Sequence, residues 1–424
     1  MKRNIFFILL CSIILLGSCG DEFTKPIPIP EPEPTPIEPL DTLQMQYKLV
    51  KNSRGERITI TGFPNIKDVV IPAEIEIDGI SYPVINLSNE SRHVSNIKTI
   101  HIPSSIKIIW VYSFSGIELE AVYIEDLAAW CNISFTYGPD NDHDPSYDYC
   151  SVFTKNTRFY VNNNLVKTLI IPDDVEIIRG DAFVNLDCMM VDTGNVKTIE
   201  VGAFHDSSLK ELVLSENLVS IQRCAFMGCY KLKELTLPAT LEYVGRWAFT
   251  GCGIEKVYAP SAETIAFIDT DYDINYYSEA PFGYSYDLYI NNRQQQDIVI
   301  EALKEDLGNE CFTGVNNVRS LYFKEGIISA GNYSFQYCKS LKSLTLPSTL
   351  EKISTRFDGC PALESITLKS PIPPGYKNNP AEFDYVNKDV AANCTLYVPE
   401  ESIDLYKAHG FWGQFNNIKP ISES

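Results

Sequence analysis

One apolar pattern is repeated along most of this chain of 424 residues. In the copy LKELTLPATLEYVGRWAFTGC, from Leu232 to Cys252, apolar and polar residues alternate up to a proline, and an Ala-Phe pair comes near the end. Apolar residues at the same offsets mark further copies, which begin at Ile97, Val166, Leu209 and Val318, and a copy from Leu341 is one residue shorter. Because the copies recur about every 23 residues, the chain is expected to fold as one array of similar coils.

The spacing within a copy predicts the shape of a coil. Leu235 and Leu237 face the same side of a short strand, and Pro238 ends that strand. The second apolar group ends at Phe249 and brings the chain back along the opposite wall, where the aromatic rings stack between coils. No coil can bury its inward face alone, so the array has to be continuous and closed at both ends.

The frame L..L.LP..L..IG..AF..C resembles the BspA-like type of leucine-rich repeat, also called the Treponema pallidum type. The resemblance covers about Ile66 to Leu368. It implies a mainly β solenoid, a leucine-rich repeat array of about 11–12 coils with short strands and turns. This family is common in surface proteins of Bacteroides and relatives, so the resemblance also implies a solenoid that binds proteins or cells and is not an enzyme.

The first 18 residues are predicted to be a signal peptide. A basic start, MKR, precedes an apolar stretch from Ile5 to Leu16, which is too short to span a membrane. The sequence LGSC, ending at Cys19, resembles the lipobox of bacterial lipoproteins. This resemblance implies that Cys19 is lipidated and becomes the new N-terminus, and an ordinary cleaved signal is the alternative.

Residues 19–44 are predicted to be a lipidated cysteine followed by a stalk. The acidic GDE after Cys19 resembles the signal that carries lipoproteins of Bacteroides-type bacteria to the outer face of the outer membrane. Proline at about every second position from Pro26 to Pro39 favours an extended polyproline II spacer, with a proline-motif ligand as the alternative. Thr42 lies in a short motif that resembles the O-glycosylation site of the same bacteria. We expect a lipid anchor facing the cell exterior, although a periplasmic location stays open.

The remaining chain divides into three predicted parts. Residues 45–96 form an N-terminal cap and first coil, 97–368 the solenoid, and 369–424 a last irregular coil and C-terminal cap. The aromatic residues expected to close the C-terminal end of the core are Tyr406, Phe411, Trp412 and Phe415.

Ten of the 12 cysteines remain after Cys11 and Cys19 are set aside. Four of them follow a frame phenylalanine by three residues: Cys229, Cys252, Cys338 and Cys360. Their position predicts free thiols stacked inside the solenoid as small apolar plugs. Export makes disulfides possible, and Cys131 with Cys150 is the pair to test.

Three coils are interrupted by longer excursions, at residues 121–164, 256–293 and 365–401. Each opens with a strand and returns through a similar one, FYVNNN, LYINNR or LYVPEE. The three excursions are therefore expected to be variants of one unit.

Alternating carboxylates mark the first two excursions, at Asp140, Asp142 and Asp144 and at Asp269, Asp271 and Asp273. Such spacing occurs in calcium loops, but the glycine and glutamate of an EF-hand are missing from both. Calcium is a weak candidate at the first set; a solvated acidic loop and direct ligand contact are the alternatives.

Tyrosines crowd the same excursions, at Tyr137, Tyr147, Tyr149, Tyr272, Tyr276, Tyr277, Tyr284 and Tyr286. Tyrosine beside polar groups suits protein recognition, and ring faces beside carboxylates suit stacking on sugars. The alternative is that these rings only cover the flank of the solenoid.

Two rows of outward residues on the predicted strands form a second candidate surface. The first row is often basic, at Lys67, Lys98, Lys167, Lys210, Lys233, Arg319 and Lys342. It could face an anionic partner, or its lysines could be solvated beside glutamates. The second row is apolar and aromatic, which is typical of a contact ridge, at Val70, His101, Tyr123, Ile170, Val213, Tyr258 and Tyr322.

The sequence favours a binding protein over an enzyme. A formal net charge of −20 argues against nucleic acid as a partner. None of the five histidines lies in a known catalytic or metal motif, and His143 between two aspartates is the one hydrolase-like arrangement. We predict no catalytic residue, metal or cofactor, and a monomer that reaches the membrane only through its lipid. The leading hypothesis is adhesion to a host or bacterial surface protein or glycan; the alternatives are carbohydrate capture for nutrient uptake and a structural envelope protein.

Overall fold

The computed structural model describes residues 45–53, 55–88, 96–136, 151–271, 280–375 and 386–423. The chain separates into two units, Met1–Glu38 and Pro39–Ser424, and every described residue belongs to the second unit. The predictions on Cys19 and Thr42 therefore lie outside the described residues. Within the described ranges, no helix is long and apolar enough to cross a membrane.

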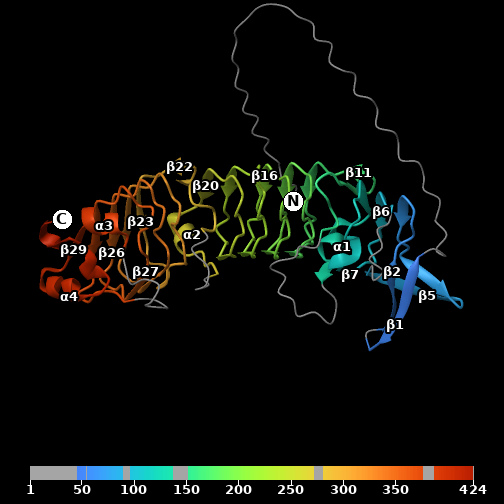
Figure 1. Cartoon of the computed structure of the whole chain (residues 1–424), viewed down its shortest axis with the longest axis horizontal. Coiled ribbons are helices and arrows are strands. Elements are labelled where there is room, and N and C mark those ends of the chain that lie inside the picture. Colours follow the sequence, from blue (N-terminus) through green and yellow to red (C-terminus); the bar gives the residue numbers. More distant parts are fainter. Residues whose placement is uncertain are drawn as a thin grey trace, which may run out of the picture. The chain divides into compact units, whose positions relative to one another are not determined.

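One wall of the second unit, which we name the strand face, consists of short strands in four sheets (Figure 1). Neighbouring strands from successive coils are parallel, and two short antiparallel strands, β11 and β22, end the first and third sheets. The first sheet holds β3 (Asp68–Val70), β6 (Thr99–Ile102), β8 (Ala121–Ile124), β10 (Arg158–Val161) and β11 (Asn164–Leu165). The second holds β12 (Thr168–Ile170), β14 (Met190–Asp192) and β16 (Glu211–Val213); the third holds β18 (Glu234–Thr236), β20 (Lys256–Ala259), β21 (Asp287–Ile290) and β22 (Arg293–Gln294). The fourth holds β23 (Asp297–Ile300), β24 (Ser320–Phe323), β26 (Ser343–Leu346), β28 (Ser365–Leu368), β29 (Thr395–Val398) and β30 (Asn417–Pro420).

The second wall carries the returning part of each coil. At its N-terminal end lie β1 (Gln46–Asn52), β2 (Gly55–Gly62), β4 (Glu74–Ile77), β5 (Ile80–Leu87), β7 (Ile108–Trp110) and β9 (Ser134–Thr136). It continues through β13 (Ile177–Ile178), β15 (Thr198–Ile199), β17 (Ser220–Ile221), β19 (Tyr243–Val244), β25 (Ser329–Asn332) and β27 (Lys352–Ser354). The pairs β1–β2 and β4–β5 are antiparallel and form the N-terminal cap. The helices are α1 (Leu127–Cys131), α2 (Ala262–Ala266), α3 (Lys388–Asn393) and α4 (Ile403–Ala408), with 3-10 turns at Val111–Phe114, Glu400–Ser402, Trp412–Gln414 and Ile421–Glu423.

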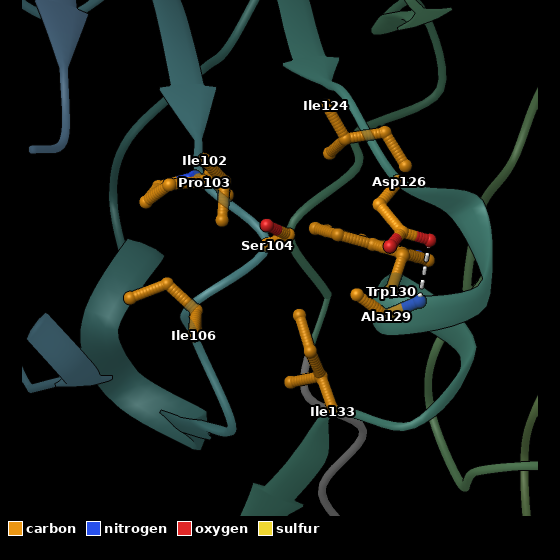
Figure 2. Close-up of a pocket in the computed structure, with 9 residues that line it drawn as sticks. All are labelled: Ile102, Pro103, Ser104, Ile106, Ile124, Asp126, Ala129, Trp130 and Ile133. Atoms are coloured by element: carbon orange, nitrogen blue, oxygen red, sulfur yellow. Dashed lines mark hydrogen bonds between the residues drawn. The ribbon is translucent and has the colours of Figure 1, made fainter. Parts of the chain in front are cut away.

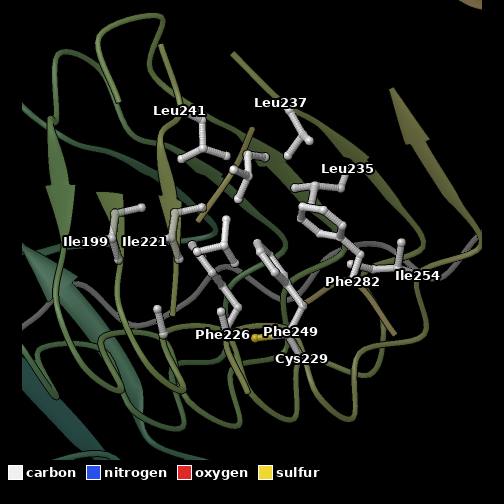
Figure 3. Packing of buried hydrophobic residues seen from close by; sticks show 14 of the residues in the cluster. Ile199, Ile221, Phe226, Cys229, Leu235, Leu237, Leu241, Phe249, Ile254 and Phe282 are labelled. Carbon is white, nitrogen blue, oxygen red and sulfur yellow. The ribbon is translucent and has the colours of Figure 1, made fainter. Parts of the chain in front are cut away.

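The core lies between the two walls and uses the frame residues that the sequence predicted (Figure 3). Leu235, Leu241 and Phe249 are each at most 4% exposed. Frame rings stack from coil to coil, with centroids 5.2 Å apart in both Phe204–Phe226 and Phe226–Phe249. The predicted β solenoid is therefore confirmed, although it has about 14 turns and not the predicted 11–12.

The coils of Phe183, Phe204, Phe226, Phe249, Phe312 and Phe335 each turn through two left-handed residues, placed two positions before and two after the phenylalanine. Around Phe249 these are Trp247 and Gly251, with φ angles of 61° and 75°. At Gly228, which has a φ of 77°, a Cβ would also lie 2.0 Å from a carboxylate oxygen of Asp206 in the neighbouring coil. Backbone conformation and this contact both favour glycine at that position.

The frame cysteines are free thiols, as predicted, and they also donate hydrogen bonds. Each bonds a phenylalanine carbonyl of the preceding coil, in the pairs Cys229–Phe204 (3.2 Å), Cys252–Phe226 (3.1 Å), Cys338–Phe312 (3.1 Å) and Cys360–Phe335 (2.9 Å). At the same frame position, Ser207 donates to the Phe183 carbonyl over 2.7 Å. The thiols therefore act as buried donors and not only as apolar plugs. Cys131 is a buried free thiol, and Cys150 lies outside the described residues.

Each interrupted coil lies between two adjacent parallel strands of the strand face, namely β8 and β10, β20 and β21, or β28 and β29. The first two return as hairpins, β10–β11 and β21–β22, whose turns are Asn162-Asn163 and Asn291-Asn292. All four asparagines have positive φ, the requirement of a type I′ turn. The third return has no hairpin, because β29 pairs directly with β30.

The C-terminal aromatic residues close the core as predicted. Tyr406 and Trp412 are at most 1% exposed, and Phe411 and Phe415 are buried beside them. The Tyr406 hydroxyl donates to the Ser370 carbonyl over 2.9 Å, so its polar end is satisfied inside the cap.

Candidate ligand-binding surface

One row of side chains runs along the outside of the strand face, and we name it the outward column. It consists of the third residue of each strand, and cross-strand register aligns these residues within each sheet. Its members are Val70, His101, Tyr123 and Tyr160; Ile170, Asp192 and Val213; Thr236, Tyr258 and Tyr289; and Val299, Tyr322, Thr345, Thr367, Tyr397 and Lys419. All seven members that the sequence predicted are in this column.

The spacing of the repeat does not reveal four aromatic or aliphatic members of the column: Tyr160, Tyr289, Val299 and Tyr397. Three of them lie on return strands, where an excursion has shifted the 23-residue spacing. The signal that could have found them is the shared tyrosine in FYVNNN, LYINNR and LYVPEE, since each of these stretches is a strand with tyrosine at its third position.

Aromatic rings in the outward column stack on one another across neighbouring strands. His101 and Tyr123 are 4.3 Å apart with an interplanar angle of 4°, and Tyr123 and Tyr160 are 4.5 Å apart at 12°. Tyr258 and Tyr289 form a second pair at 4.9 Å. The rings therefore cover each other's faces, and they offer edges and hydroxyl groups to a partner.

Aliphatic members of the column are more exposed than the stacked rings. Ile170 is 63% exposed, Val299 51% and Val213 46%. Large apolar side chains in one line on an acidic protein are typical of a contact surface. These residues supply apolar contact area that the core does not use.

His101 is held in its neutral form within the ring stack. Burial lowers the pKa of His101, and the nearby carboxylates of Asp68 and Glu125 oppose this shift. Burial also raises the pKa of Tyr123, its stacking neighbour. Near neutral pH the stack therefore carries no charge, and protonation of His101 adds one at acidic pH.

Three lysines of the basic row beside the outward column form ion pairs with glutamates of the next coil. Ion pairs join Lys98 to Glu120 (3.6 Å), Lys233 to Glu255 (3.2 Å) and Lys342 to Glu364 (2.8 Å). The lysine side chains in these pairs are 41–54% exposed, so each pair contributes little to stability. These contacts favour the hypothesis of solvated lysines over that of a cationic stripe.

Two of the predicted acidic site residues belong to the second wall. The Asp269 carboxylate accepts from the Thr270 amide (3.0 Å) and from the Asn309 side chain (3.5 Å). The Asp271 carboxylate accepts from the Arg246 amide over 3.3 Å, and burial together with Asp271 raises the pKa of Tyr243. Both carboxylates therefore hold neighbouring coils together.

The other predicted site residues lie outside the described residues: Tyr137, Asp140, Asp142, Asp144, Tyr147, Tyr149, Tyr272, Asp273, Tyr276 and Tyr277. Where the structure is described, no group of three or more His, Cys, Asp or Glu side chains could hold a metal ion. The weak calcium candidate stays a prediction.

Two further tyrosines of the second excursion have different environments. Tyr286 is 1% exposed and meets the ring of Phe282 edge-on at 5.9 Å, so the expectation that it serves recognition is wrong. Tyr284 is 46% exposed and packs edge-on against Tyr337 at 5.0 Å. The sequence could not separate the two because both precede the same return strand.

A small crevice opens beside α1, between Ile102, Ile124 and Trp130 (Figure 2). Its cavity volume is about 10 Å³, far below the roughly 300–1,000 Å³ of pockets that enclose organic ligands. Its one carboxylate, Asp126, accepts from the Ala129 amide over 2.9 Å and caps the helix. The crevice therefore does not compete with the outward column as a ligand site.

A family model described as the BspA type leucine rich repeat region matches the chain in six copies, over residues 65–137, 154–272 and 286–375. No curated protein matches the chain. Similar solved structures include a leucine rich cell surface protein from Faecalibacterium prausnitzii, with 16% identity, 92% of this chain and 96% of that chain covered, and a TM-score of 0.46. A leucine-rich repeat protein from Bacteroides ovatus has 16% identity, coverage of 90% and 99%, and a TM-score of 0.42; the pneumococcal vaccine antigen PcpA has 17%, coverage of 90% and 98%, and a TM-score of 0.42. At such TM-scores the structural likeness supports no conclusion about function.

Proposed function

Because the chain belongs to the BspA-type leucine-rich repeat family, we propose that its solenoid is the binding module of a cell-surface protein. In this proposal the outward column of the strand face contacts a surface protein of a host or of another bacterium. The observation that carries it is the row of outward side chains from β3 to β29, in which aromatic and aliphatic residues outnumber the polar Asp192, Thr236, Thr345 and Thr367. Frame residues build the core, so the outward positions are free to carry recognition.

A protein partner suits the column better than a glycan does. Sugars stack on exposed ring faces, but the faces of His101, Tyr123 and Tyr160 are turned toward one another. Ring edges with hydroxyl groups and aliphatic side chains such as Ile170 match the mixed apolar and polar contacts of protein interfaces. Carbohydrate capture is therefore the weaker alternative.

The anchoring part of the proposal rests on the sequence alone. Lipidation at Cys19 and the proline-rich spacer would hold the solenoid away from the outer membrane, on the cell exterior, as a monomer. Glycosylation at Thr42 would decorate the end of that spacer. Changing Cys19 to alanine should release the protein from membranes, and unchanged membrane retention would contradict the anchor.

Binding to immobilised extracellular-matrix proteins and to a glycan array tests the proposed contact surface. The soluble full-length Cys19→Ala protein should bind at least one protein probe, and Tyr123→Ala should weaken that binding at least tenfold. Lys98→Ala on the neighbouring row is the matched control and should change affinity less than twofold. Equal losses in both variants, or binding to glycans alone, would contradict a protein-binding column.

A further inference from the structure

Two interrupted coils repeat one arrangement of elements, which the 23-residue frame does not reveal. In residues 121–170 the order is β8, α1, β9, β10, β11 and β12; residues 256–299 run through β20, α2, β21, β22 and β23. Both helices have five residues and an N-cap side chain, from Asp126 in α1 and Ser261 in α2. After each helix the chain joins the second wall, through β9 beside β7 or through the bridge from Asp269 to Tyr243.

Both coils present the same outward side chains, and we name each set a contact unit. The first contact unit is Tyr123, Tyr160, Asn162, Asn163 and Ile170, and the second is Tyr258, Tyr289, Asn291, Asn292 and Val299. In each, two neighbouring tyrosine rings, stacked at 12° in the first unit and tilted at 32° in the second, lead into a type I′ turn with exposed asparagines, and an exposed β-branched residue follows on the next strand. In both units the β-branched residue follows the second tyrosine by ten positions in the sequence.

The chemistry common to both contact units is uncharged. The charged residues near the two units differ: β10 begins with Arg158, whereas β21 begins with Asp287 at the equivalent position. A partner that both units recognise therefore presents a neutral surface, which excludes sulfated and other anionic polymers. The second tyrosines lie opposite Leu165 and Gln294 of the hairpins in the cross-strand register. The uncharged amide, hydroxyl and aliphatic groups of both units suit a polypeptide.

The two contact units are related by translation along the solenoid. Their strands are parallel, and β11, β12, β14, β16, β18 and β20 lie between β10 and β21. At about 4.8 Å per strand, the units are roughly 30–35 Å apart along the array of parallel strands. A two-fold symmetric partner presents its copies in opposite directions, whereas a head-to-tail assembly presents them in one direction.

We propose that the two contact units are equivalent binding sites for a protein polymer that repeats one neutral epitope along its length. This inference rests on the proposed function and adds the class of partner and the bivalent mode of binding. Two linked sites on one polymer bind far more tightly than either alone, since the second contact forms intramolecularly.

The test compares polymers with their dispersed subunits. Type I collagen fibrils and flagellar filaments serve as polymer probes, triple-helical collagen and flagellin as their subunits, and amylopectin as an uncharged glycan; the full-length Cys19→Ala protein is the analyte. The wild-type surface should bind one polymer at least tenfold more tightly than its subunit. Ile170→Asp and Val299→Asp should each remove this gain, and the double variant should remove the remaining binding.

Val219→Asp is the matched control, because Val219 is also an exposed valine (38%) but directly precedes β17 of the second wall, outside the outward column. It should keep the gain, and all the variants should melt at the wild-type temperature because the substituted side chains are exposed. Equal affinity for polymer and subunit, an effect of only one unit, loss in Val219→Asp, binding to amylopectin alone, or no binding to either polymer would overturn the inference. Binding to a subunit that a single variant abolishes would overturn bivalency and leave the proposed function intact.

Discussion

The regular coils between Leu186 and Cys252 and the two coils with contact units solve the same packing problem differently. In the regular coils the frame residues are used inward, in stacked phenylalanine rings and in thiols that bond the preceding coil. The interrupted coils add a second aromatic stack on the outside of the strand face. Regular coils therefore supply stability, and interrupted coils supply side chains that stability does not require.

The largest expected difference in stability is between a variant that removes a ring from the core and one that removes a ring from the outer surface. Phe249→Ala should lower the free energy of unfolding by about 3–5 kcal/mol, because Phe249 is 1% exposed and its loss leaves a cavity between coils. Tyr289→Ala, on the outside, should cost about 1 kcal/mol or less. Denaturant unfolding of both variants measures the difference, and equal losses would mean that the outer stack is structural.

Substitution of the turn glycine should have the next largest effect. Gly228→Ala should destabilise the fold by about 1–2 kcal/mol, because alanine is strained at a φ of 77° and its Cβ would crowd Asp206. The matched change in an interrupted coil, Asn292→Gly, should be neutral or stabilising, since the type I′ turn accepts glycine. Thermal melting of the two variants compares the turns directly, and a neutral Gly228→Ala would contradict the steric explanation.

The buried frame cysteines should react more slowly with alkylating reagents in the folded protein than in the unfolded protein. Hydrogen bonding to Cys252 and burial raise the pKa of Cys229, so the thiolate needed for alkylation is scarce in the folded state. Iodoacetamide at pH 8 should label Cys229 only after unfolding, as mass spectrometry can show. Cys229→Ser should change stability by about 1 kcal/mol or less, because Ser207 already makes the same bond one coil earlier. Rapid labelling of Cys229 in the native protein would contradict its burial between the coils.

The smallest expected effect is a pH dependence of the outer stack. Burial lowers the pKa of His101 in the fold, so the unfolded chain binds this proton more readily. The contribution of His101 to stability is therefore present above about pH 6.5 and is lost as the pH falls below that value. His101→Gln should flatten the melting temperature between pH 7 and pH 5 relative to wild type. An unchanged pH slope would show that Asp68 and Glu125 cancel the effect of burial.

The sequence predicted most of the core and part of the candidate surface. A solenoid coil has few degrees of freedom, so an apolar residue at a frame position such as Leu235 faces inward in every copy. The same regularity placed seven members of the outward column correctly. It failed at Tyr160 and Tyr289, because excursions of different length precede them and remove the spacing that would align them with Tyr123 and Tyr258.

Local pattern also could not show which contacts Asp269, Asp271 and Tyr286 make. The Asp271 carboxylate accepts from Arg246, 25 residues away, and the Asp269 carboxylate from Asn309, 40 residues away, so both contacts join different coils. Tyr286 resembles a recognition residue, yet it is buried against Phe282.

By itself, the sequence determined that this chain stacks coils, because the period and the inward apolar residues leave no other way to bury its apolar surface. Only the tertiary structure decided which coils become neighbours after an excursion, and hence which outward side chains stand side by side. The physical reason is that inward positions are fixed by burial within one coil, whereas a contact surface is fixed by register between coils. Tyr160 lies on Tyr123 because β10 pairs with β8 across an interruption that carries no periodic signal.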